Sequence, residues 1–315
     1  MNARPRYEEL VRLARHSDWH PLDRKRELQD TIYAKPAAWQ RFATYLLLGA
    51  GAAFLLSGVV FFFAYNWAAL PRLTKLGIVG GLLLLTGFAA LFAPVRLSLR
   101  RVLLTATVVL IGVLLAVLGQ VYQTGANSYQ LFLAWSVFAI PWVVLVPFAP
   151  LYLLMVVLFN TTFLTYTQQT GAEWNYLASG NLLFVLNVVC WLVLYLLDRQ
   201  TAAHEWLTRL VALSAAIVIS LNMVNGSLGE QPLQLLLAFG LAGLVFAGWT
   251  RLAFRERSIY YLTVVGGAAI LTVTFLALQH IGGGTGSLFL CGAFLVGSVS
   301  LLAKRLQVLN VRWRD

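Results

Sequence analysis

The amino-acid sequence predicts an all-α fold: a polytopic integral membrane helical bundle of about ten transmembrane helices, with the N-terminus and the C-terminus both cytoplasmic. Hydrophobic residues make up 60% of the 315-residue chain and charged residues only 11%, whereas soluble domains carry roughly a quarter of charged residues. Apolar runs of about 20 residues, the length that crosses a hydrocarbon core of about 30 Å, recur after residue 42. Lys and Arg gather between alternate pairs of these runs.

Residues 1–41 form a separate segment, predicted to be a cytosolic amphipathic helical segment ahead of a transmembrane domain over residues 42–315. This segment holds nine Lys/Arg and six Asp/Glu, and it is too polar for a signal peptide. Pro21 is suited to the first turn of a short helix within it. Two interpretations stay open, a solvated lead-in that lies on the lipid headgroups and a docking site for a partner protein.

Ten apolar runs follow this segment, and each predicts one membrane-spanning helix. The fourth and fifth runs are separated by little more than Ala149-Pro150, and together they are too long for a single span. They therefore predict a tight helical hairpin. The runs are Ala43–Tyr65, Leu76–Pro94, Val102–Leu118, Leu131–Phe148, Leu151–Tyr166, Leu177–Leu197, Leu207–Val224, Leu233–Trp249, Ile259–Leu278 and Ser287–Ala303.

The basic residues test this division and orient it. Lys and Arg at the centre of a spanning helix cost about 2.5–3.5 kcal/mol on insertion scales, and cytoplasmic loops hold the excess of them. With the N-terminus inside, 21 of the 23 Lys and Arg fall in inner segments, and only Arg72 and Lys75 fall in an outer loop. A missed or additional helix would destroy this alternation, so the sequence predicts ten spans with a cytoplasmic N-terminus.

The same composition excludes several classes of function. The net charge of +11 lies beside hydrophobic runs and forms no basic-aromatic module, so no nucleic-acid partner is expected. Cys190 and Cys291 lie inside apolar runs with no zinc-type spacing, so neither a metal nor another cofactor is expected. No Asp, Glu or Lys lies deep in a predicted span, which disfavours carboxylate-coupled ion transport and membrane-embedded proteases.

Neutral polar residues gather at the predicted outer ends of the spans. Amides, hydroxyls and aromatic rings at that depth bind sugars, headgroups or small polar solutes, and they also cap helices and form interfacial belts. We take them as candidates for an outward-facing polar pocket, with capping and interfacial roles as the alternative. The candidates are Tyr65, Asn66, Trp67, Gln120, Tyr122, Gln123, Thr124, Asn127 and Asn160.

Two ordered motifs resemble a known family. The first is Ala64-Tyr65-Asn66-Trp67 followed by Lys75, and the second is Gly119-Gln120-x-Tyr122-x-x-Gly125 followed by Leu131-Phe132, Trp135 and Pro141. Residues 40–150 are similar in this way to the bacterial membrane proteins grouped as domain of unknown function 2157. The resemblance implies a multi-pass protein of the bacterial inner membrane with a cytosolic N-terminal segment, and it supplies no activity or catalytic residue.

The sequence supports two hypotheses about function. The first is transport, or the handling of lipids or small polar solutes, through an outward-facing pocket at the ends of the first, third and fifth spans. The second is a non-catalytic scaffold or a subunit of a membrane complex, with a membrane-protein partner or a second copy of the chain. An enzyme embedded in the bilayer is less favoured than either, because no catalytic constellation is visible.

Overall fold

A computed structural model describes residues 39–44, 46–47, 50–51, 54, 67–94, 96–170, 175–201, 205–229, 231–281 and 284–314. The chain divides into two compact units, Met1–Pro71 and Arg72–Asp315. In the first unit, residues 39–44 are helical. The predicted cytosolic segment 1–41 and the first apolar run, Ala43–Tyr65, lie mostly outside the described residues.

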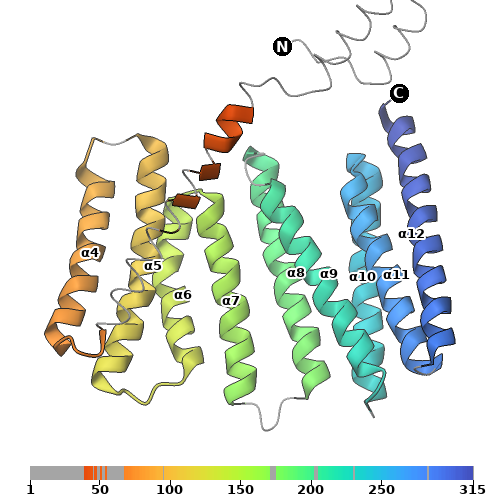
Figure 1. Cartoon of the computed structure of the whole chain (residues 1–315), viewed down its shortest axis with the longest axis horizontal. Helices are drawn as coiled ribbons and strands as arrows, with labels where there is room; N and C mark the ends of the chain where they lie inside the picture. The colour runs from red at the N-terminus through yellow and green to blue at the C-terminus, as the bar shows by residue number, and fades with distance from the viewer. Residues whose placement is uncertain are drawn as a thin grey trace, which may run out of the picture. The chain divides into compact units, whose positions relative to one another are not determined.

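The second unit is built from long helices, and the described residues contain no β-strand. Each of the nine later apolar runs corresponds to one helix, in the predicted order (Figure 1), although the second and fourth runs extend two and three residues past the ends of α4 and α6. All nine of these described helices are long and apolar enough to cross a membrane, which confirms the predicted fold class. They are α4 Arg72–Phe92, α5 Leu97–Tyr122, α6 Ser128–Leu145, α7 Ala149–Gln169, α8 Tyr176–Thr201, α9 Glu205–Gly226, α10 Pro232–Glu256, α11 Ile259–Ile281 and α12 Thr285–Arg314.

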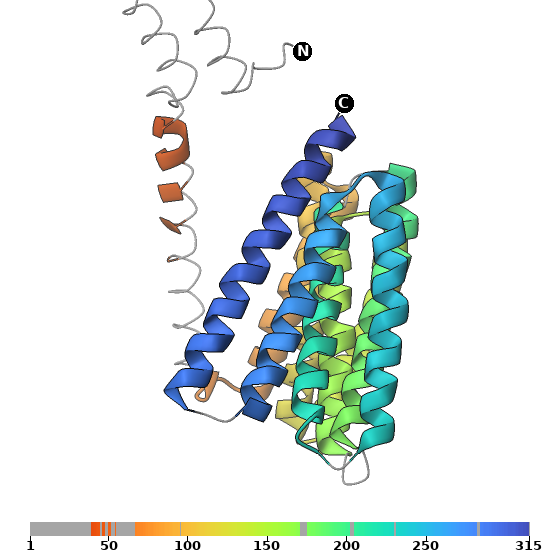
Figure 2. The same ribbon diagram turned by 90° about the vertical axis from the view of Figure 1, so that its right-hand side faces the viewer.

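Consecutive helices of the second unit run antiparallel (Figures 1 and 2), so their ends gather on two opposite sides. We call one side the basic end and the other the amide end. The basic end carries Arg96, Arg100, Arg101, Arg209, Arg251, Arg255, Arg257, Lys304 and Arg305. The amide end carries Gln123, Asn127, Gln169, Asn225 and Gln279. The predicted alternation of charge is thus a property of the bundle, whereas the assignment of the basic end to the cytoplasm remains a prediction.

The predicted hairpin between the fourth and fifth runs is present. Helix α6 ends at Leu145 and α7 begins at Ala149, so only three residues separate them. Pro150 lies in the first turn of α7, where its missing N–H would have no helical partner and its fixed φ suits the helix. The backbone N–H groups of Leu151 and Tyr152 both donate to the Phe148 carbonyl, at 3.0 and 3.2 Å. This geometry reverses the chain within a very short connection.

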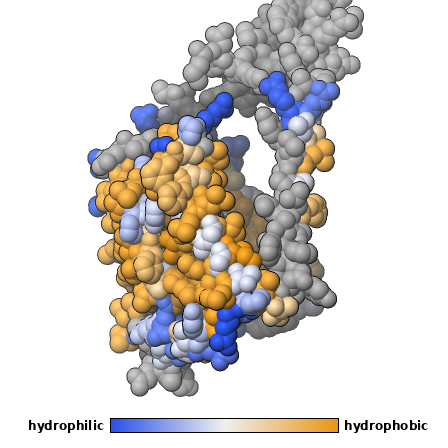
Figure 3. Space-filling view, turned by 90° about the vertical axis from the view of Figure 1, so that its left-hand side faces the viewer, coloured by the Kyte–Doolittle hydropathy of each residue, from blue (hydrophilic) through white to orange (hydrophobic). Residues whose placement is uncertain are grey.

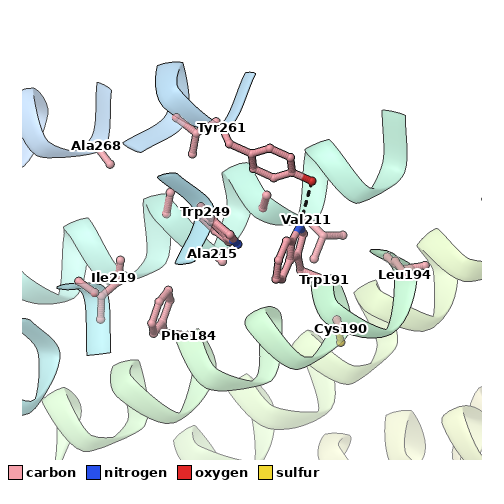
Figure 4. Packing of buried hydrophobic residues seen from close by; sticks show 14 of the residues in the cluster. Phe184, Cys190, Trp191, Leu194, Val211, Ala215, Ile219, Trp249, Tyr261 and Ala268 are labelled. Carbon is pink, nitrogen blue, oxygen red and sulfur yellow. Dashed lines mark hydrogen bonds between the residues drawn. The ribbon is translucent and has the colours of Figure 1, made fainter. Parts of the chain in front are cut away.

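Two clusters of buried residues join α5 through α11 of the second unit, and α7 contributes to both. The smaller cluster joins α5, α6 and α7 around Val108, Ala139 and Leu158. The larger cluster contains residues of α7, α8, α9, α10 and α11. Figure 4 shows its aromatic part, where the Trp191 indole N–H donates to the Tyr261 hydroxyl at 3.3 Å. Outside these clusters large apolar side chains face outward, and Figure 3 shows them as a hydrophobic band with hydrophilic residues at both ends.

Candidate functional site

The predicted cluster from Gln120 to Asn127 lies at the end of α5 and in the turn that leads to α6. Its members Gln120, Tyr122, Gln123, Thr124 and Asn127 are all exposed. Gln123 caps the end of α5 in the left-handed region, with φ 48°. Asn127 caps the start of α6, where its backbone N–H donates to the Gln130 side chain at 3.0 Å. At least two of the candidates therefore have a capping role in the turn itself.

The start of α6, which follows this turn, lies beside the end of α7. The Tyr129 backbone N–H donates to the Gln169 side-chain oxygen at 3.2 Å, and the rings of Tyr129 and Tyr166 meet edge to face at 5.2 Å. The structure does not test the contribution that the sequence predicts for the end of the first span. Tyr65 and Asn66 lie outside the described residues, and Trp67 is part of the first unit, which is described by itself.

Asn160 lies away from the amide end, near the middle of α7. It precedes Gln169 by nine residues, or about 14 Å along the helix axis. Its side chain pairs with that of Asn187 on α8: the Asn187 amide donates to Asn160 Oδ1 at 2.7 Å, and the Asn160 amide donates back at 3.4 Å. The Ser214 hydroxyl of α9 donates to Asn187 Oδ1 at 3.1 Å. Asn160 is therefore part of a three-helix polar contact at mid-depth.

A second amide pair joins α8, α9 and α10 closer to the amide end. The Asn222 amide donates to Asn181 Oδ1 at 2.9 Å and to the Leu177 carbonyl at 3.1 Å. The Asn181 amide donates in turn to the Gln234 carbonyl of α10 at 3.0 Å. Gly180 makes room for this pair, because a Cβ at that position would lie 2.1 Å from Asn222 Oδ1. Satisfied polar contacts of this kind fix the register of helices in a membrane.

Sequence reasoning did not single out Asn181 or Asn187, because each is one polar residue inside a long apolar run. The signal that could have found them is the amide itself, since an unpaired amide in hydrocarbon is costly and implies a partner. The identity of the partner depends on which helix faces follow each other in space. That information is not present in the order of residues along one helix.

A groove of about 660 Å³ runs between α9 and α11 on the other side of α9. Its floor includes small residues, among them Ala216, Gly267 and Ala268. Its walls are larger apolar side chains that are about half exposed, such as Ile217 and Phe275. The groove extends from Tyr260 near the basic end to Asn225 and Gln279 at the amide end.

Two hydroxyl groups in this groove have no hydrogen-bond partner. They belong to Ser220 of α9 and Thr272 of α11, and both oxygens are buried in the structure. In most helices such a hydroxyl donates to a carbonyl one turn earlier, as Thr274 of α11 does to Ile270 at 2.7 Å. The groove therefore differs from the α8–α9 contact in leaving polar groups unsatisfied.

A second pocket of about 520 Å³ opens at the basic end. It is formed by the ends of α8 and α10, the starts of α9 and α11, and Asn310 of α12. Its charged residues are Glu205, Arg209, Glu256 and Arg257. We call it the charged pocket.

Tyr260 borders both the charged pocket and the groove. Its hydroxyl donates to the Arg209 carbonyl at 2.6 Å, which ties the start of α11 to α9. The Arg209 guanidinium lies 5.4 Å from the centroid of the Tyr260 ring, in cation–π range. The two sites therefore share Tyr260, with charged groups in the one and mostly apolar side chains in the other.

One family model matches part of the chain. Residues 22–152 match the family model described as a predicted membrane protein (DUF2157), which confirms the resemblance found in the sequence. The match includes α4, α5, α6 and the start of α7. No curated protein and no solved structure matches the chain. The groove and the charged pocket are built from residues 195–310, so both lie outside the matched region.

Proposed function

We propose that this multi-pass membrane protein handles membrane lipid, with an acyl chain in the groove between α9 and α11 and a headgroup in the charged pocket. The observation that carries the proposal is the meeting of these two sites at Tyr260. Membrane lipids have the same division, since a charged or polar headgroup is joined to long apolar chains. A small polar solute would match the pocket but not the groove.

The dimensions and surface of the groove support an acyl chain. Tyr260 and Gln279 are 19 residues apart on α11, which corresponds to about 28 Å and approaches the thickness of the hydrocarbon core. The wall residues Leu213, Ile217 and Leu221 are partly exposed along the outer side of α9. Lipid chains have direct access to such a surface. Contacts with a narrow groove supply the packing that binds a chain, because the bilayer itself is equally apolar.

The proposal places the protein in the bacterial inner membrane with the basic end in the cytoplasm. The one-sided distribution of Lys and Arg supports this orientation. Cysteine labelling tests it, since the natural Cys190 and Cys291 are buried and give little background. A membrane-impermeant maleimide should label Gln123→Cys, and not Arg305→Cys, in spheroplasts. The opposite pattern would reverse the orientation.

Photo-crosslinking tests the lipid proposal directly. The full chain is placed in nanodiscs that contain phospholipid with a diazirine in one acyl chain, and labelled peptides are identified by mass spectrometry after irradiation. We expect enriched labelling of α9 and α11 at the groove. Gly267→Leu should lower that labelling about fivefold, the equivalent of about 1 kcal/mol of lost packing.

Gly267 suits this test because it borders the groove and a Cβ there would meet no atom within 4 Å. Gly243→Leu on α10 is the matched control, since its Cβ position is equally open and it does not border the groove. Equal labelling of all outward helix faces, unchanged by Gly267→Leu, would contradict the proposal. That result would favour a scaffold or a subunit of a membrane complex.

A further inference from the structure

The charged pocket contains equal numbers of acidic and basic side chains. Glu205 and Glu256 supply two negative charges, and Arg209 and Arg257 supply two positive charges. This balance differs from that of the whole chain, whose net charge is +11. Exposed arginines around the basic end attract anionic headgroups without selecting among them. A pocket with both signs is suited instead to a ligand with both signs.

The two acidic residues of the pocket are in different situations. Glu205 forms an ion pair with Arg209 one helical turn away on α9. Glu256 accepts a hydrogen bond from the Tyr195 hydroxyl of α8. Among the described residues, no Lys or Arg forms an ion pair with Glu256. Its carboxylate is therefore held in position by a neutral group.

A basic residue, Arg257, follows Glu256 directly in the chain and also borders the pocket. Arg257 ends α10 in the left-handed region, with φ 51°, and the chain reverses there to begin α11. Its guanidinium donates to the Trp313 carbonyl of α12 at 3.0 Å, which fixes the side chain at the side of the pocket. Glu256 and Arg257 are thus presented together at one turn, and Arg209 lies across the same pocket.

We infer that the charged pocket recognises the headgroup of a zwitterionic aminophospholipid. The ammonium group pairs with Glu256, the phosphate lies against the guanidinium groups of Arg257 and Arg209, and the acyl chain passes Tyr260 into the groove. This inference rests on the proposed function and adds the class of lipid. An anionic lipid would bring its phosphate near Arg257 but would leave the Glu256 carboxylate without a partner and repelled by a second negative charge.

The test compares headgroups on one acyl chain. Nanodiscs contain the full chain and either phosphatidylethanolamine or phosphatidylglycerol, each with the same diazirine-bearing chain. We expect groove labelling to be about three- to fivefold higher with phosphatidylethanolamine, a range suited to charges at a partly exposed site. Glu256→Gln should reduce the ratio to near one. Glu205→Gln is the control that removes the same charge from a carboxylate already paired within the protein, and it should retain more of the preference.

The outcomes separate this inference from the proposed function. Labelling at the groove with no headgroup preference would overturn the inference and leave lipid binding intact. An equal loss of preference in Glu256→Gln and Glu205→Gln would overturn the assignment of the ammonium to Glu256, because net charge alone would then explain selection. Absence of groove labelling with either lipid would defeat the proposed function itself.

Discussion

The two sides of α9 use polar residues in opposite ways. Toward α8, the Ser214 hydroxyl and the Asn222 amide make hydrogen bonds to Asn187 and Asn181, and Asn222 is only 4% exposed. Toward α11, Ser220 lies beside a groove and its hydroxyl has no partner. The difference shows that a polar residue in a spanning helix is not in itself a sign of function. A satisfied group of this kind fixes the packing of two helices, whereas the Ser220 hydroxyl contributes no hydrogen bond to the packing of α9.

The largest expected effect is on the packed side, from Gly180→Ala. The new Cβ would lie 2.1 Å from Asn222 Oδ1, so the substitution displaces that side chain and breaks its two hydrogen bonds. We expect the free energy of unfolding to fall by about 2–4 kcal/mol, measured by equilibrium unfolding in mixed micelles. Gly267→Ala on the open side is the control and should show no loss. Similar stability of the two variants would mean that the α8–α9 contact is looser than described.

A smaller effect is expected from breaking the mid-depth contact. Asn187→Leu removes the paired amide that meets Asn160 and Ser214, and it should lower the free energy of unfolding by about 1–2 kcal/mol. A double-mutant cycle with Asn160→Leu should give a coupling energy of about 1 kcal/mol. Additive effects of the two substitutions would show that the amides do not stabilise each other.

The smallest effect compares two serines on the same helix. Ser214→Ala removes the hydrogen bond to Asn187 and should cost about 0.6 kcal/mol of unfolding free energy. Ser220→Ala removes a buried hydroxyl that has no partner, so the stability should stay the same or rise slightly. Equilibrium unfolding of the two variants under the same conditions measures the difference in their free energies of unfolding. A greater loss for Ser220→Ala would indicate a hydrogen bond that the groove side is not expected to have.

Much of the fold could be predicted from the sequence because spanning a bilayer is a local requirement. Leu151–Tyr166 is mostly apolar and about 24 Å long as a helix, so it predicts a spanning helix there whatever its neighbours are. The site was less accessible to prediction. Gln123 and Asn127 proved to be capping residues of the α5–α6 turn, and Asn160 lies at mid-depth against Asn187. Their proposed part in a polar pocket stays a prediction.

The sequence by itself determined the helical class, the order of nine described spans and the gathering of basic residues on one side, because hydrophobic length and charge act on each segment separately. Only the tertiary structure decided which face of each helix meets another. It joined Tyr260 to Arg209 across 51 residues and left a groove beside Gly267. Spatial proximity of this kind arises from packing between helices, since residues distant in sequence become neighbours only when their helices are packed.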